Sequence, residues 1–181
     1  MTLPPVALGA TTTVVLDVVA WAGIHAGTGY AAHRLSSTRL ATDSWVTRAR
    51  AWERDGRAYE RIRIRRWKDR LPEAGALFPG GVSKRALPAG GRGAIEQFVP
   101  ETRRAEYAHW WCIAASPVFV VWNPPWVVPV MVAYAVVVNL PFVLIQRYNR
   151  LRVLRIATRR TSRSDSSVGS SRPAPRGSSI P

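Results

Sequence analysis

A short polar segment from Glu101 to His109 contains the residue types used in acid–base chemistry. Pro100 and the acid after it predict the start of a helix, and this helix places Glu106 and His109 three residues apart on one face. A carboxylate beside an imidazole fixes the ring tautomer and raises its basicity, so the ring can take a proton from a hydroxyl group. We therefore predict a catalytic group of His109, Glu106 and Glu101. The bland alternative is an interfacial helix whose charges meet lipid headgroups, which is the commoner meaning of an isolated Glu-x-x-His pair.

Three further polar clusters contain residues that suit anionic or sugar ligands. Two arginines, Arg103 and Arg104, follow Glu101 after one threonine. The segment Gln146-Arg-Tyr-Asn-Arg150 ends a long apolar run, and a basic stretch surrounds Lys68. Guanidinium groups suit phosphate and carbonyl oxygens. The alternatives are an Arg/Tyr anchor at the end of a span and a solvated basic face. The candidate substrate-binding residues are Arg103, Arg104, Lys68, Arg147, Tyr148, Asn149 and Arg150.

Long apolar segments must position these clusters. They cover residues 6–32, 107–122 and 126–145, and Asn123-Pro-Pro125 breaks the last two apart. A membrane-spanning helix needs about 20 residues. We therefore predict an all-α integral membrane protein with about three transmembrane helices, one N-terminal and two in a C-terminal hairpin. A cleaved signal peptide is the alternative for the first, and a re-entrant hairpin for the other two. Asp17 is expected to face other helices or water, because a carboxylate facing lipid is costly.

The charge distribution sets the predicted orientation. The net charge is +15, and no Lys or Arg lies in residues 1–33 or 105–146. The positive-inside bias places residues 34–104 in the cytoplasm as a basic interfacial cap. Residues 1–160 form one membrane-embedded domain in this interpretation, and residues 161–181 a disordered basic tail.

Composition also narrows the partners and cofactors. The high pI of about 11.5 is typical of nucleic-acid binding, but no helix-turn-helix, zinc or RNA-binding motif is present. Anionic lipid explains the charge better, so we predict the bilayer and no nucleic acid as a partner. Cys112 is the single cysteine, and the Glu-x-x-His motif has no second copy. We therefore predict neither a metal nor a cofactor.

These segments, in their order and spacing, resemble one family, the glycosyl-4,4'-diaponeurosporenoate acyltransferases of bacterial carotenoid pathways. The resemblance covers roughly Ala41 to Arg155, and Leu151 departs from it, as does the long basic tail. It rests on Arg66-Trp-Lys68, Glu101-Thr-x-Arg-Ala-Glu-x-x-His109-Trp110 and Asn139-x-Pro-x-x-x-x-Gln-Arg-Tyr-Asn-Arg150, with similar Lys68-Asp-x-Leu-Pro72 and Gly80-Gly-x-x-Lys84 patterns.

The resemblance implies transfer of a fatty acyl group to the glucose C6 hydroxyl of a glycosylated carotenoid acid, as in staphyloxanthin-type pigments. The expected partners are an acyl donor, either acyl-CoA or acyl carrier protein, and the carotenoid acceptor. On this interpretation Arg104 and Arg147 hold the donor phosphate or the oxyanion. The enzyme is expected in a bacterial cell membrane, multi-pass, with a cytoplasm-facing site. The alternatives are a non-catalytic membrane scaffold for lipid or pigment enzymes, and an acyltransferase acting on another glycolipid.

Overall fold

The described part of the chain is all-helical. The computed structural model describes residues 4–71 and 92–169, the side chains of residues 92 and 163–169 excepted. The predicted all-α class is confirmed there, because these residues contain no strand. The order is α1 (Ala10–His33), α2 (Ser37–Ala41), η1 (Ala51–Glu60, a 3-10 helix), α3 (Ile64–Trp67), η2 (Lys68–Arg70), α4 (Arg92–Ala115), η4 (Ser116–Val121, also 3-10) and α5 (Val127–Gly169).

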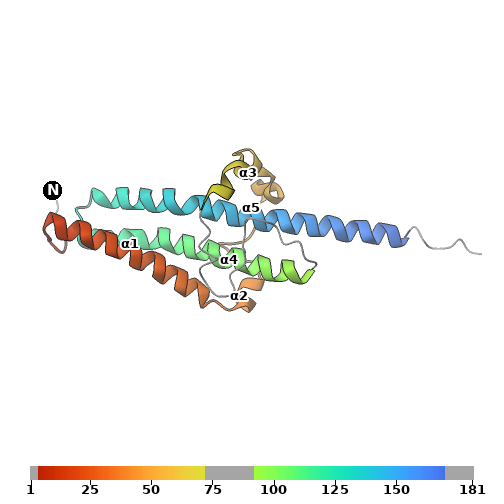
Figure 1. The fold of residues 1–181 in the computed structure, drawn as a ribbon, viewed down its shortest axis with the longest axis horizontal. Coiled ribbons are helices and arrows are strands. Elements are labelled where there is room, and N and C mark those ends of the chain that lie inside the picture. The colour runs from red at the N-terminus through yellow and green to blue at the C-terminus, as the bar shows by residue number, and fades with distance from the viewer. Residues whose placement is uncertain (1–3, 72–91, 170–181) are drawn as a thin grey trace, which may run out of the picture.

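Three long helices build the frame that positions the polar clusters. Helix α4 packs against both α1 and α5, while η1 packs on α5 (Figure 1). Figure 1 shows the N-terminal end of α1 beside the connection between η4 and α5. A backbone hydrogen bond from Val6 N to Val121 O, 3.0 Å long, joins these two segments. The segments α2, η1 and α3 lie away from that end. The two ends of the molecule are therefore built from different elements.

The end near the η4–α5 connection presents apolar side chains outward. By length and composition, two described helices can cross a membrane, namely α1 and residues Val127–Ser162 of α5. Outward-facing valines on both are largely exposed, among them Val18 at 65% and Val137 at 71%. Exposed apolar side chains gathered on a helix are typical of a surface that contacts a membrane or another protein. The count of three spans and the interfacial cap stay predictions.

Asp17 is the one carboxylate in α1, and it faces the neighbouring elements as expected. Its Oδ1 accepts hydrogen bonds from Trp122 Nε1 and Asn123 Nδ2, both 2.8 Å long. These two donors stand just before the two prolines that separate η4 from α5. The carboxylate therefore ties α1 to the connection between the other two long helices.

Two helix boundaries differ from the sequence expectations. The predicted start at Pro100 is wrong, because α4 begins at Arg92 and passes through that proline. Helix α5 continues to Gly169, so residues 161–169 of the segment predicted as disordered are helical. The predicted patterns in residues 72–91 and the rest of the tail, residues 170–181, lie outside the described residues.

Candidate functional site

Four buried charged side chains from three elements form the centre of the polar region. Glu53 comes from η1, Glu106 from α4, and Arg147 and Arg150 from α5. Arg147 binds Glu53 through two hydrogen bonds of 2.9 Å and Glu106 through one of 2.5 Å. Arg150 Nη2 donates to the other oxygen of Glu106 at 2.7 Å. Both carboxylates are fully buried, and their two negative charges match the two guanidinium groups.

Backbone carbonyls satisfy further donors of the two arginines. Arg147 donates to Val46 O at 3.0 Å and to Arg48 O at 2.9 Å, and Arg150 donates to Thr47 O at 2.7 Å. Taking charges out of water costs several kcal/mol per ion, which only good geometry and added hydrogen bonds offset. The network therefore fixes the segment before η1 against α4 and α5.

Glu53 is the network residue that the sequence analysis did not select. It also accepts hydrogen bonds from the Tyr59 hydroxyl and the Arg50 backbone N–H. Burial acts to raise the pKa of Glu53, but the hydrogen bonds from Arg147, Tyr59 and Arg50 outweigh it and lower that pKa. Burial and the hydrogen bond to this carboxylate raise the pKa of Tyr59. At neutral pH, Glu53 is therefore ionised and Tyr59 is neutral.

His109 is held by two residues of α5. Its Nδ1 lies 3.0 Å from Asn139 Oδ1, and its ring stacks on Phe142 with centroids 4.8 Å apart. The Asn139 Nδ2 group donates to Ala135 O at 2.9 Å, which fixes the orientation of the amide. Because the amide oxygen only accepts, Nδ1 carries the proton and the lone pair of the neutral ring lies on Nε2. This tautomer suits a general base.

The predicted pairing of Glu106 with His109 has a different setting in the structure. Glu106 Oε1 accepts from Arg147 and, at 3.4 Å, from Trp110 Nε1, while Oε2 accepts from Arg150. The described hydrogen bond of the His109 ring goes to Asn139 instead. Asn139 belongs to the motif that carries the family resemblance, but its position near the start of that motif gave it no assigned role. The part of Glu106 in orienting the ring stays a prediction.

Arg103 and Arg104 bind the ends of two preceding helices. Arg103 Nη1 donates to Leu40 O and Ala41 O, both at 2.7 Å, and Nη2 pairs with Asp43 at 2.5 Å. Arg104 Nε pairs with the predicted catalytic Glu101 at 3.0 Å. Its Nη1 donates to the carbonyl oxygens of Ala32, His33 and Leu35 at 3.0, 2.6 and 2.7 Å. Terminal carbonyls of a helix lack partners within it, so these arginines complete the C-terminal ends of α1 and α2.

The remaining candidates lie in different surroundings. Tyr148 is buried, and its hydroxyl accepts from Arg65 Nε at 2.8 Å. Asn149 is buried beside it in α5 at 1% exposure. Lys68 pairs with Asp69 at 2.6 Å. The structure thus brings Glu106, Arg147 and Arg150 into one network, while Lys68 and Glu101 belong to separate ion pairs.

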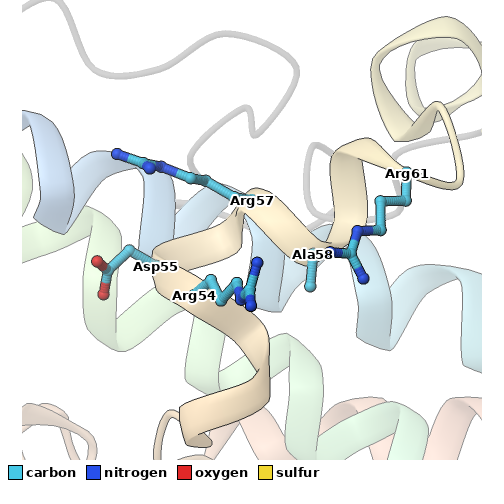
Figure 2. Close-up of a pocket in the computed structure, with 5 residues that line it drawn as sticks. All are labelled: Arg54, Asp55, Arg57, Ala58 and Arg61. Carbon is cyan, nitrogen blue, oxygen red and sulfur yellow. The ribbon is translucent and has the colours of Figure 1, made fainter.

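A hollow lies on the outer side of η1, apart from the predicted site residues. It has a volume of about 480 Å³ and is lined by Arg54, Asp55, Arg57, Ala58 and Arg61 (Figure 2). In Figure 2 the guanidinium groups of Arg54 and Arg61 lie on either side of Ala58, and Arg57 extends away from them. Within residues 4–71 and 92–162, no three His, Cys, Asp or Glu side chains gather as metal ligands.

Comparisons with known proteins converge on one family. The glycosyl-4,4'-diaponeurosporenoate acyltransferase family matches residues 42–159, which include the buried network, His109 and Asn139. The enzyme of that name from Staphylococcus aureus strain USA300 is 35% identical over 106 residues, or 56% of this chain and 63% of the relative. That of Staphylococcus haemolyticus is 33% identical over 104 residues, or 57% of this chain and 60% of the relative. The chain thus spans less than two thirds of these relatives. Among solved structures, none matches.

Proposed function

The chain belongs to the glycosyl-4,4'-diaponeurosporenoate acyltransferase family, and from this premise we propose that it is a membrane O-acyltransferase of carotenoid biosynthesis. It moves a fatty acyl group from an acyl thioester to the glucose C6 hydroxyl of a glycosylated carotenoid acid. The observation that carries the proposal is the hydrogen bond between His109 Nδ1 and Asn139 Oδ1. It leaves the basic lone pair on Nε2, as removal of a hydroxyl proton requires.

The reaction needs one proton relay and no covalent intermediate. His109 Nε2 takes the proton of the C6 hydroxyl while the hydroxyl oxygen forms a bond to the acyl carbonyl carbon. The carbon–sulfur bond then breaks, and the departing thiolate takes the proton back from the imidazolium. Asn139 holds the Nδ1–H group throughout, so the ring keeps its orientation. A positioned general base contributes typically about 10²- to 10⁴-fold in rate.

The buried network acts in this mechanism as a positioning device. His109 stands on α4 and Asn139 on α5, so their contact depends on how these helices pack. Glu106 is one helical turn from His109, and it binds both Arg147 and Arg150 of α5. The described hydrogen bonds engage all three nitrogens of the Arg147 guanidinium. They favour a positioning role for Arg147 over the predicted contact with a donor phosphate or an oxyanion.

We place the apolar end of the molecule in the membrane. An acceptor with a polyene and a sugar is amphipathic, so its sugar lies at headgroup depth while the polyene lies in the hydrocarbon. The exposed valines of α1 and α5 support this placement, and so does the arginine-rich opposite part of the chain. The proposed topology has three crossings, by α1, by α4 with η4, and by the first half of α5. Residues 34–104 lie in the cytosol with the site.

The test uses purified full-length protein in lipid nanodiscs with the glycosylated carotenoid and an acyl thioester. Mass spectrometry follows the ester product. His109→Gln should lower kcat by about 10²- to 10⁴-fold. The matched control is His33→Gln, at the exposed end of α1, which should keep its activity.

Three outcomes would contradict the proposal in different ways. Wild-type kcat in His109→Gln removes this residue as the base. Absence of ester with any donor, combined with lower pigment flux in a deletion strain, favours the scaffold alternative. Loss of a different acylated glycolipid from that strain assigns another acceptor.

A further inference from the structure

Cationic side chains that form no described hydrogen bond or ion pair line the hollow beside η1. Arg54, Arg57 and Arg61 all line it and are exposed. Within residues 4–71 and 92–162, no hydrogen bond or ion pair of their side chains is present, whereas Arg65 nearby binds Glu60 and Tyr148. The arginines that the sequence suggested for a donor phosphate are engaged by carboxylates and carbonyls. Guanidinium groups that have no partner among the described residues provide donors for a multiply charged anion.

The backbone at the hollow is bent and held against α5. Three consecutive residues have positive φ, namely Arg54 at 48°, Asp55 at 55° and Gly56 at 87°. An added Cβ at Gly56 would lie 3.4 Å from Leu151 Cβ and 3.5 Å from Tyr148 O. Glu53, directly before the bend, binds Arg147. The hollow therefore occupies a fixed place on α5, because contacts on both sides of the bend anchor it.

The hollow and the His109 site lie at different positions along α5. The bend contacts Leu151, and the His109 ring contacts Asn139 of the same helix. At 1.5 Å per residue, these two positions of α5 are roughly 18 Å apart along its axis. A donor that bridges them needs an anionic head at the hollow, a long linear arm, and a thioester at the other end.

We propose that this hollow binds the phosphate-bearing head of coenzyme A, so that acyl-CoA is the acyl donor. This inference rests on the proposed acyltransferase function and selects one of its two donors. The extended pantetheine arm of coenzyme A has a length of the same order as the separation of the two positions. The guanidinium groups of Arg54 and Arg61 lie on either side of Ala58 at the hollow, while Arg57 adds a third positive charge but extends away from them. A small site of this kind suits a compact polyphosphate, whereas an acidic carrier protein docks on a broad surface. Asp55 lines the same hollow and limits its positive charge, which disfavours promiscuous anion binding.

The experiment compares charge-matched variants of the full chain in zwitterionic nanodiscs. One variant combines Arg54→Gln, Arg57→Gln and Arg61→Gln. The control combines Arg34→Gln, Arg39→Gln and Arg70→Gln, which removes the same charge from exposed positions outside the hollow. Calorimetry measures binding of coenzyme A, dephospho-coenzyme A and pantetheine. Steady-state assays measure KM and kcat with acyl-CoA and with acyl carrier protein.

The hollow variant should bind coenzyme A at least about tenfold more weakly and show a matching rise in KM, with kcat nearly unchanged. The control should stay within about twofold of the wild type, and affinity of the wild type should fall in the order coenzyme A, dephospho-coenzyme A, pantetheine. The single variants Arg54→Gln and Arg61→Gln should each show part of the effect if the triple variant is unstable.

Some results would contradict coenzyme A binding at the hollow and leave the acyltransferase function intact. Others would contradict the acyltransferase function and leave binding at the hollow to be decided separately. Unchanged coenzyme A affinity in the hollow variants, or ester formation from acyl carrier protein alone, removes coenzyme A from the hollow while acyl transfer stands. Loss of binding to phosphatidylglycerol vesicles with unchanged coenzyme A affinity assigns the hollow to lipid headgroups. If no donor yields ester, the proposed function fails. The binding measurements would still show whether coenzyme A binds at the hollow.

Discussion

At the scale of single residues, the two nitrogens of the His109 ring have different roles. Nδ1 faces the amide oxygen of Asn139, so the neutral ring keeps its lone pair on Nε2. Asn139→Ala removes the hydrogen bond between Asn139 Oδ1 and Nδ1 and lets both tautomers form. We expect kcat to fall by about 10- to 100-fold, the effect that loss of the residue orienting a histidine ring has at metal sites. KM should change little, because Asn139 does not contact substrate in this mechanism.

Steady-state kinetics with acyl thioester and glycosylated carotenoid measure this change. The control is Thr158→Ala on the same helix, whose exposed side chain bonds only to Leu154 O in the described structure. Equal losses in both variants, or a rise in KM with unchanged kcat, would argue against a positioning role for Asn139.

Glu53 should control the acid stability of the protein. Its pKa in the folded state lies below the ordinary value of 4.5, because the hydrogen bonds from Arg147, Tyr59 and Arg50 outweigh burial. The resulting stabilisation is fully present above about pH 4.5 and is lost as pH falls through the lowered folded-state pKa. The Tm of the wild type should therefore fall steeply on acidification below that pH. Glu53→Gln, which does not titrate, should show a flatter decline.

The same substitution should destabilise the protein at neutral pH by about 3 kcal/mol, because it leaves Arg147 short of a buried charge partner. Glu60→Gln is the matched control on η1, since Glu60 pairs with Arg65 at the surface. Its cost should stay below about 1 kcal/mol. Denaturant titration of both variants at pH 7 and pH 4 checks the prediction, and equal costs for the two would refute it.

At the scale of elements, arginine side chains on the side of α4 bind the C-terminal ends of α1 and α2. Arg104 of α4 reaches three carbonyls at the end of α1 and also pairs with Glu101. Arg104→Ala leaves these carbonyls without that donor, and we expect a loss of about 2 kcal/mol in unfolding free energy. Lysine at this position keeps the charge but lacks the fork geometry, so Arg104→Lys should recover part of the stability.

This prediction separates the joining role from the role that the sequence suggested. If Arg104 acts on α1 alone, the KM for the acyl donor stays at the wild-type value in Arg104→Lys while Tm falls. A raised KM with unchanged Tm would instead restore Arg104 as a ligand of the donor phosphate. Thermal melting and donor kinetics on one preparation give both readings.

The sequence predicted elements better than the contacts between them. Asn123-Pro-Pro125 predicted the break before α5, because consecutive prolines lack the amide donors of a helix. Pro100 gave a wrong prediction for the start of α4, because a long packed helix tolerates one proline when tertiary contacts compensate. Up to Arg160, the length of α5 agrees with its arginines and with Leu151 and Leu154, which favour helix. The helical state of the Ser-rich residues 161–169 has no explanation in their helix propensities.

The candidate site shows the same limit. Spacing on one helix identified Glu106 and His109, and a motif identified Arg147 and Arg150. No spacing rule connects Glu53 to Arg147, because their ion pair joins η1 to α5 across a large sequence separation. Partners of this kind appear only when the elements are packed, which is also why the bond from Asn139 to His109 was not predicted.

At the scale of the whole molecule, apolar and charged surfaces occupy opposite ends. The connection between η4 and α5 lies with the N-terminal end of α1, and α2 lies at the opposite end of α1 (Figure 1). Asp17 holds the first of these ends together through Trp122 and Asn123. This arrangement fits a protein that crosses the bilayer with its arginines in the cytosol.

Cysteine labelling of the proposed topology tests this arrangement directly. Trp126→Cys stands at the exposed η4–α5 connection, and Thr38→Cys stands in the exposed α2. A membrane-impermeant maleimide should label Trp126→Cys in intact spheroplasts and Thr38→Cys only after permeabilisation. The wild type reports the background, because its single Cys112 is 3% exposed. Labelling of both variants only after permeabilisation would make the α4–α5 hairpin re-entrant, and labelling of Thr38→Cys alone in intact cells would invert the orientation of the site.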